Sequence, residues 1–214
     1  ASVVAGAGGS TKNAIDLVDR YEEVGADATM LMFPQRPGIN RDGLEPYYRQ
    51  IIESTDLGVM LYKKDVRLDT ELVDELGSHE NVVAVKHAIG DLSNFVADVN
   101  DVDSDLVWVD GTAEVPAVGF GVEGVDGFTT GIGNFVPELA LDLMDAIEAE
   151  DWERARELRE LARPFQEIRG QVEGSTSVGV VKHGLDVAGF YGGPVREPLK
   201  PMAEEYREQV EDIY

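Results

Sequence analysis

Residues 57–91, LGVMLYKKDVRLDTELVDELGSHENVVAVKHAIGD, contain the pattern that decides the fold. Two short apolar runs, LGVMLY and NVVAVK, flank a longer amphipathic stretch that begins at Asp69, a residue type that favours helix N-termini. The apolar runs are rich in Val, Leu and Met and lack clean period-two alternation, as is typical of strands buried on both faces. The stretch therefore predicts two parallel strands joined by a crossover helix.

The same alternation continues along the chain. Further apolar runs are expected to form strands at residues 2–6, 28–33, 106–110 and 125–130. Helices are expected at residues 10–24, 42–54, 69–76, 91–99, 112–120, 136–150, 151–168, 175–187 and 202–213. This order predicts an α/β fold in which residues 1–150 form a partial (β/α) barrel that carries catalysis and residues 151–214 form a C-terminal helical segment.

The alternative to a barrel is an open doubly wound sheet. No GxGxxG motif is followed by an acidic residue about 20 positions later, as a dinucleotide site would require. Chemically suggestive residues also recur at the ends of several apolar runs, where the active sites of barrels lie. The pattern thus favours a (β/α)₈ TIM barrel, although the 214 residues contain too few strands for a closed one.

Composition and charge exclude several classes of function. The chain has no cysteine, which excludes disulfides, thiolate nucleophiles and zinc–cysteine sites, and no run approaches the roughly 18 apolar residues of a membrane span. Forty-two acidic residues outnumber 18 basic ones, for a net charge of -24, so nucleic acids and anionic membranes are not expected as partners. The dispersed acidic residues and scarce lysine favour a halophile's cytoplasmic protein over an acidic mesophilic enzyme.

Lys86 and Tyr62 are the main candidates for catalysis. Lys86 ends a predicted buried strand, where desolvation lowers the pKa of an amine and lets it attack a ketone to form a Schiff base. Tyr62 ends the preceding strand, so a parallel sheet would place its phenol beside Lys86, where it could relay a proton. The structural alternatives are a lysine that reaches solvent or pairs with Asp91, and a tyrosine that only packs.

Further polar groups follow the ends of other predicted strands. Arg67 could bind a substrate carboxylate through two parallel hydrogen bonds, although an isolated arginine is more often a surface residue. Thr129, Thr130 and Asn134 lie in FTTGIGN, a candidate substrate loop or simply a glycine-rich turn. Gly111 begins GTAE, where backbone N–H groups could bind an anion at a helix start. His79, His87 and His183 lack the spacing of metal ligands and are interpreted as structural or surface residues.

The order of several motifs resembles the dihydrodipicolinate synthase/N-acetylneuraminate lyase family. The motifs are AGAGG, LGVMLY, VVAVKHAIGD, GTAEVPAVGFG and GGPVREPL. The segments STDLGVMLYKKD, GTAEV with FTTGIGNFVP, and VKHGLDVAGFYGGPVREPL are most similar to the dehydratase branch that acts on 5-dehydro-4-deoxyglucarate. The resemblance implies a Schiff-base (β/α)₈ barrel of which this chain holds only strands four to eight and the C-terminal helices, so the sequence is expected to begin mid-protein.

The resemblance also implies roles for individual residues. Lys86 matches the Schiff-base lysine and Tyr62 the proton-relay tyrosine. Thr129 and Thr130 occupy the place of two serines near the substrate, and Asn134 matches a nearby asparagine. The sequence departs from the family at two positions, since the tyrosine is followed by Lys63 rather than asparagine and the lysine by His87 rather than aspartate. Arg67 matches a carboxylate-binding arginine of the synthase branch.

The activity implied by the resemblance is that of a lyase acting on a small 2-oxo acid. The first expectation is dehydration and decarboxylation of 5-dehydro-4-deoxyglucarate to 2,5-dioxopentanoate, without a metal or organic cofactor. The alternatives are a 2-keto-3-deoxygluconate-type aldolase or a 4-hydroxy-tetrahydrodipicolinate synthase, a group that Arg67 favours. A non-catalytic remnant or assembly subunit is a further alternative of another class. The family also implies a homo-oligomer, with a tetramer expected.

Overall fold

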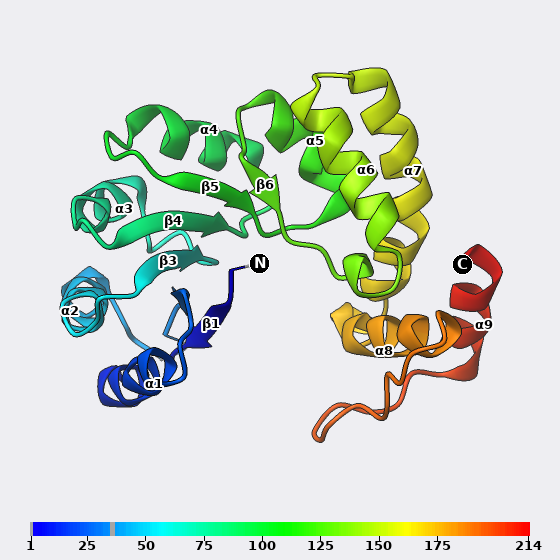
Figure 1. The fold of residues 1–214 in the computed structure, drawn as a ribbon, viewed down its shortest axis with the longest axis horizontal. Coiled ribbons are helices and arrows are strands. Elements are labelled where there is room, and N and C mark those ends of the chain that lie inside the picture. Colours follow the sequence, from blue (N-terminus) through cyan, green and yellow to red (C-terminus); the bar gives the residue numbers. More distant parts are fainter. Residues whose placement is uncertain (1, 35–36) are drawn as a thin grey trace. The chain divides into compact units, whose positions relative to one another are not determined.

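The computed structural model describes residues 2–34 and 37–214, which form strands and helices in regular alternation (Figure 1). The strands are β1 (Val4–Ala7), β2 (Ala28–Leu31), β3 (Gly58–Lys63), β4 (Val82–His87), β5 (Val107–Asp110) and β6 (Gly127–Phe128). The helices are α1 (Thr11–Glu23), α2 (Arg41–Ile52), α3 (Thr70–Gly77), α4 (Leu92–Asp101), α5 (Glu114–Val122), α6 (Pro137–Glu148), α7 (Trp152–Arg169), α8 (Ser177–Val187) and α9 (Glu204–Ile213). Two 3-10 turns, η1 (Ile132–Asn134) and η2 (Val172–Gly174), complete the elements.

The strands form one sheet in the order β1-β2-β3-β4-β5-β6, and the pairs from β1 to β5 are parallel. Consecutive strands that pair side by side, each followed by a helix, are the construction of a (β/α) barrel and not of a doubly wound sheet, whose strand order reverses. The expectation that the chain holds only strands four to eight is not supported, because the described residues form six strands and not five.

The helix starts follow from local sequence chemistry. Ser10, Asp69 and Asp91, which the sequence indicates as N-caps, accept hydrogen bonds from the backbone N–H groups of Asn13, Leu72 and Ser93 respectively. Each bond satisfies a donor that the first helical turn leaves without a partner. These three predicted helix starts are confirmed.

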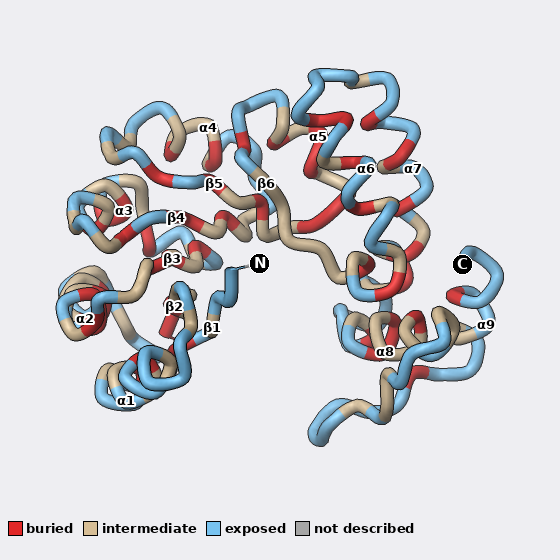
Figure 2. Tube along the Cα trace, in the orientation of Figure 1, coloured by how far each residue is buried: buried red, intermediate tan, exposed pale blue. Residues whose placement is uncertain are grey.

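Strands β2 and β3 are fully buried on one face only. Along β3, Val59, Leu61 and Lys63 are buried while Met60 and Tyr62 are half-buried, and β2 alternates in the same way. The expectation of burial on both faces is therefore wrong for these strands. Figures 1 and 2 show helices α1 to α4 along one side of the strands, with buried positions where helix and strand meet. Residues 58, 60 and 62 consequently share the less covered face.

The chain divides into two compact units. The first comprises residues 1–111 and 123–127, and the second comprises residues 112–122 and 128–214. In the second unit, α5, α6 and α7 pack around Leu143 and Leu158, and α7, α8 and α9 pack around Phe165 and Val180. From residue 151 onward the described chain contains helices and no strand.

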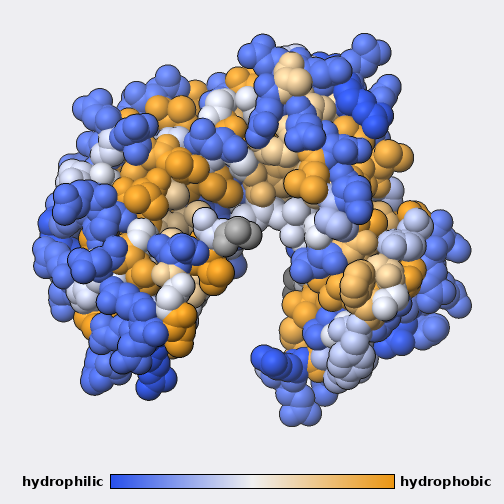
Figure 3. All heavy atoms as spheres, in the orientation of Figure 1, coloured by the Kyte–Doolittle hydropathy of each residue, from blue (hydrophilic) through white to orange (hydrophobic). Residues whose placement is uncertain are grey.

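The surface agrees with the acidic composition. Figure 3 shows hydrophilic residues over the outward sides of α1, α2 and α3. Within the described residues, no helix is both long enough and apolar enough to span a membrane.

Candidate active site

Lys86 and Tyr62 lie side by side on neighbouring strands. Their Cα atoms are register partners in the parallel pairing of β3 with β4. The Lys86 Nζ atom lies 4.7 Å from the centre of the Tyr62 ring. Both side chains are half-buried and project from the less covered face of the sheet, near the C-terminal strand ends. The arrangement places an amine and a phenol where one bound molecule can contact both.

The surroundings of the pair favour a neutral amine. The pKa of Lys86 is lowered overall, and burial is the largest cause. The carboxylate of Asp110 raises this pKa, whereas the positive charge of Lys64 lowers it. Burial also raises the pKa of Tyr62, so the phenol keeps its proton at neutral pH. A lysine with a lowered pKa beside a protonated phenol is suited to nucleophilic attack on a carbonyl, with a proton donor at hand.

Asp110 is a buried acid at this site that the sequence does not single out. It ends β5, is a register partner of His87, and has no solvent exposure. The one sequence signal for Asp110 is its place at the end of an apolar run, where chemistry-bearing residues of barrels recur.

The backbone N–H of Gly111 is engaged within the chain. Its N–H donates to the carbonyl oxygen of His87 at 2.7 Å, so it extends the strand pairing and is engaged rather than presented to an anion. A Cβ at residue 111 would lie 2.8 Å from the Cβ of Ala88 and 3.0 Å from the Cε of Lys86. Gly111 therefore provides the space that the Lys86 side chain occupies.

Arg67 is exposed and already holds a carboxylate of its own chain. Its Nε donates to Asp65 Oδ1 at 2.8 Å and its Nη2 to Asp65 Oδ2 at 2.6 Å, while Nη1 donates to the carbonyl of Ile39 at 3.1 Å. The guanidinium also lies 5.0 Å from the centre of the Phe33 ring and holds the pKa of Asp65 at about 2. A substrate carboxylate at Arg67 would have to displace Asp65.

The FTTGIGN segment is built around a buried carboxylate in the second unit. Glu114 is fully buried and accepts a hydrogen bond from Thr130 Oγ1, which in turn accepts one from the N–H of Gly133 at 3.1 Å. Thr129 is half-buried. Asn134 is exposed, and its Nδ2 donates to the carbonyl of Gly131 at 2.9 Å. Thr130 is thus fixed by Glu114, a residue that the sequence indicates only as part of GTAE.

Arg169 is a second charged group that sequence reasoning missed. Its guanidinium passes so close to Gly131 that a Cβ there would lie 2.4 Å from its Cζ. Its Nε donates to Ser177 Oγ at 3.3 Å. Gly131 therefore leaves the space that the Arg169 guanidinium occupies. The guanidinium lies beside the predicted substrate segment. Nothing in the charged pattern of α7 distinguishes Arg169 from the surface arginines of that helix.

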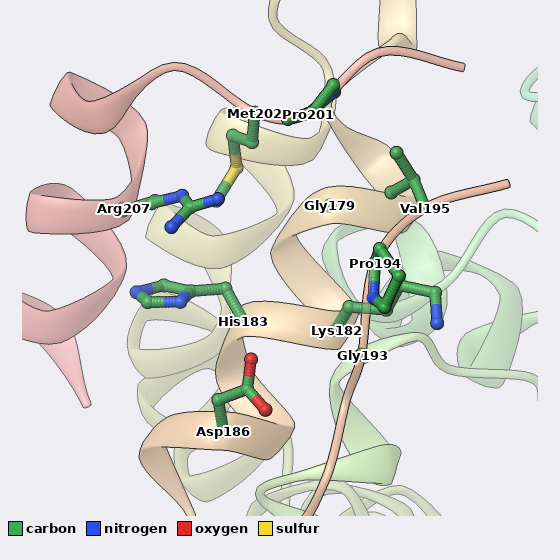
Figure 4. A pocket seen from close by; sticks show the side chains of 10 residues that line it. All are labelled: Gly179, Lys182, His183, Asp186, Gly193, Pro194, Val195, Pro201, Met202 and Arg207. Carbon is green, nitrogen blue, oxygen red and sulfur yellow. The ribbon is translucent and has the colours of Figure 1, made fainter. Parts of the chain in front are cut away.

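A pocket of about 140 Å³ in the second unit is lined by residues of α8, by the loop that follows it and by Arg207 of α9 (Figure 4). Its basic groups have partners within the chain. Lys182 Nζ donates to the Gly192 carbonyl at 2.7 Å, His183 Nε2 lies 3.0 Å from Glu211 Oε1, and Arg207 Nε lies 3.9 Å from Glu204 Oε2. No predicted site residue lines it. Over residues 2–34 and 37–214, no group of His, Asp or Glu side chains has the arrangement of a metal site.

Comparison with known proteins identifies the family. Residues 1–214 match the dihydrodipicolinate synthetase family along their whole length. The chain belongs to this family. A dihydrodipicolinate synthase from Oceanobacillus iheyensis superposes with a TM-score of 0.96 at 32% identity, covering 100% of this chain and 72% of that one. The TIM-barrel fold expected from the sequence is thereby supported, and members of the family are lyases.

Two similar relatives carry dehydratase names. A 5-dehydro-4-deoxyglucarate dehydratase from Pseudomonas putida is 30% identical over 216 residues, which cover 99% of this chain and 71% of that protein. A probable 5-dehydro-4-deoxyglucarate dehydratase from Pseudarthrobacter chlorophenolicus is 32% identical over 206 residues, covering 94% of this chain and 67% of that protein. The family and the lyase class follow from these likenesses.

Proposed function

We propose that this protein is a Schiff-base-forming lyase in which Lys86 is the nucleophile and Tyr62 transfers protons. The observation that carries the proposal is the 4.7 Å approach of the Lys86 amine to the Tyr62 ring. The downward direction of the Lys86 pKa adds support, because only the neutral amine attacks a carbonyl. Membership of a lyase family makes this chemistry the natural use of the pair.

The reaction begins when the Lys86 nitrogen attacks the ketone carbon of a 2-oxo acid. The carbonyl oxygen leaves as water after two protons reach it, and Tyr62 is placed to deliver one of them. The resulting iminium draws electrons from the adjacent C–H bond, which allows proton loss, departure of a β-hydroxyl, decarboxylation or retro-aldol cleavage. Hydrolysis of the iminium returns the free amine of Lys86.

The substrate that we propose is 5-dehydro-4-deoxyglucarate, which loses one water and one CO₂ to give 2,5-dioxopentanoate. The names of the two dehydratase relatives support this choice. Thr129, Thr130 and Asn134 are proposed to bind the hydroxyls, with Thr130 held in place by Glu114.

The second candidate is a 2-keto-3-deoxygluconate-type aldolase or a 4-hydroxy-tetrahydrodipicolinate synthase. The similarity to a solved dihydrodipicolinate synthase at 32% identity supports it. The bond between Arg67 and Asp65 weighs against one argument for it, because Asp65 occupies the guanidinium that would bind the substrate carboxylate.

Two further properties belong to the proposal. The resemblance to the family supports a homo-oligomer, with a tetramer expected, and light scattering after gel filtration measures it. The net charge of -24 supports a halophilic cytoplasmic protein. In that case the melting temperature rises steeply between low and molar salt, and a flat salt dependence would contradict a halophilic protein.

Product analysis tests the substrate. Incubation with 5-dehydro-4-deoxyglucarate is expected to release CO₂ and 2,5-dioxopentanoate in equal amounts, and Lys86→Met is expected to abolish both. The matched control is Lys12→Met, at a lysine whose side chain is 82% exposed. Release of pyruvate from 2-keto-3-deoxygluconate would instead support the aldolase. Failure to form a borohydride-trapped adduct with any 2-oxo acid would support the non-catalytic alternative.

A further inference from the structure

A buried ion pair lies directly behind the proposed catalytic pair. Lys63 and Asp98 have no solvent exposure, and the Lys63 Nζ atom lies 2.7 Å from Asp98 Oδ1 and 2.6 Å from Oδ2. Thr70 Oγ1 donates to Asp98 Oδ1 at 2.6 Å. Removing a lysine and a carboxylate from water carries a large desolvation cost that their mutual attraction offsets only with good geometry. A pair in this position therefore calls for an explanation other than stability.

His87 completes the cluster. It has no solvent exposure, and its Nε2 lies 3.1 Å from Asn94 Oδ1 and 3.4 Å from Asp98 Oδ2. Burial lowers the pKa of His87, so the ring is neutral at neutral pH. Because both neighbours of Nε2 are acceptors, Nε2 carries the hydrogen. The cluster thus ties β3, β4, α3 and α4 together through side chains of each.

The cluster and the catalytic pair use adjacent residues of the same two strands. Lys63 is the register partner of His87, as Tyr62 is of Lys86. Successive residues of a strand face opposite sides, so the cluster faces the helices while Tyr62 and Lys86 face the opposite side. A slip of one residue between the strands would exchange the two faces and move Lys86 away from Tyr62.

The register of β3 against β4 changes part-way along the two strands. The pairing of β3 with β4 is irregular between Val59 and Met60, whose partners are Val82 and Ala84, so Val83 is passed over. The pairing of residues 60–63 with residues 84–87 lies beyond this irregularity, so contacts near that end must fix its register. Fixing register is the best-attested use of buried polar groups.

We propose that Lys63, Asp98 and His87 are positioning residues that fix the register of β3 against β4 beyond the irregularity and so hold Tyr62 beside Lys86. The proposal deepens the proposed function and rests on it for its catalytic consequence. Its structural part, the Tyr62–Lys86 contact, does not depend on which substrate the enzyme uses.

The test compares loss of one charge with loss of both. Lys63→Met and Asp98→Leu each leave a buried charge without its partner and are expected to lower the melting temperature by about 10 °C. The double variant Lys63→Met/Asp98→Leu leaves no charge unpaired and is expected to recover most of that loss. Lys12→Met, the same change at an exposed lysine, is the matched control and is expected to change nothing.

Two readouts separate positioning from stability. The first readout is the NMR chemical shift of ¹³C-methyl groups attached to the lysines. The ring current of Tyr62 is expected to shift the Lys86 signal. The variant Lys86→Arg identifies that signal by its loss, and Tyr62→Leu gives its position without the ring. The double variant is expected to lose that shift and to form the borohydride-trapped adduct at least tenfold more slowly than wild type. A double variant that recovers its melting temperature and keeps both the shift and the trapping rate would overturn the proposal.

The same experiment distinguishes this failure from failure of the proposed function. A wild-type protein that shows the Tyr62-dependent shift but is not trapped by any 2-oxo acid would refute the Schiff-base chemistry and leave the NMR comparison as a valid test of positioning. A wild-type protein without the shift would refute the positioning role directly.

Discussion

The substitution Gly111→Ala tests the geometry around Lys86 with a single methyl group. The new Cβ would lie 3.0 Å from Lys86 Cε, 3.1 Å from Lys86 Cγ and 2.8 Å from Ala88 Cβ. Carbon atoms prefer separations of about 3.5–4.0 Å, so Lys86 and Ala88 must give way by roughly 0.5–1 Å. The flexible lysine moves more readily than the backbone at Ala88, and its amine therefore leaves the Tyr62 ring.

Gly111→Ala is expected to slow Schiff-base formation more than it lowers the stability of the fold. A misplacement of about 1 Å at a reacting group slows catalysis roughly 100-fold, whereas added bulk in a packed region costs about 1–3 kcal/mol of stability. We therefore expect Gly111→Ala to form the borohydride-trapped adduct about 100-fold more slowly while the protein still unfolds cooperatively. Intact-mass spectrometry at timed intervals measures the rate, and thermal unfolding measures the stability.

Gly90→Ala is the matched control. Residue 90 lies in the same part of the chain, and a Cβ there would meet no atom within 4 Å. It should keep the wild-type trapping rate. If Gly111→Ala also keeps that rate, Lys86 does not depend on the space beside Gly111, and the argument that places its amine against Tyr62 is wrong.

Two further predictions concern charge. Asp110→Asn removes the carboxylate that raises the pKa of Lys86, so the pH midpoint of adduct formation is expected to move lower, and an unchanged midpoint would count against their coupling. Arg67→Met is expected to raise the pKa of Asp65 from about 2 toward its ordinary 3.8. The stability that this pair contributes is present above pH 4 and is lost as the pH falls through the native pKa of Asp65. Wild type should therefore lose more stability on acidification than Arg67→Met. Carboxyl NMR measures the pKa, and acid unfolding measures the stability.

The main features of fold and site could be predicted because they depend on local pattern. Caps such as Ser10 and Asp69 act within one helical turn, and their sequence signals need no tertiary information. The neighbourhood of Tyr62 and Lys86 follows from strand ends in a parallel sheet. The six apolar runs predict six strands, and the sheet has six. The assignment to strands four to eight is not supported, because a resemblance to part of a family does not fix which strands a chain contains.

The residues that were missed depend on contacts far apart in the chain. Lys63 and Asp98 are 35 positions apart, and each looks like a surface charge in its own segment. The sequence around His87 does not show that its ring is buried, because that burial depends on α4, which brings Asn94 against it. The role of Gly111 depends on the path of the Lys86 side chain, and that of Gly131 on Arg169 from another helix. No periodicity or composition encodes such pairings.

Peptide-mapped borohydride trapping with pyruvate tests the central claim most directly. We expect a reduced adduct on the tryptic peptide that contains Lys86. The adduct should be absent in Lys86→Met, retained in Lys12→Met and formed more slowly in Tyr62→Phe. A stable adduct on any other lysine, or a folded wild-type protein that pyruvate and 5-dehydro-4-deoxyglucarate both fail to label, would contradict it.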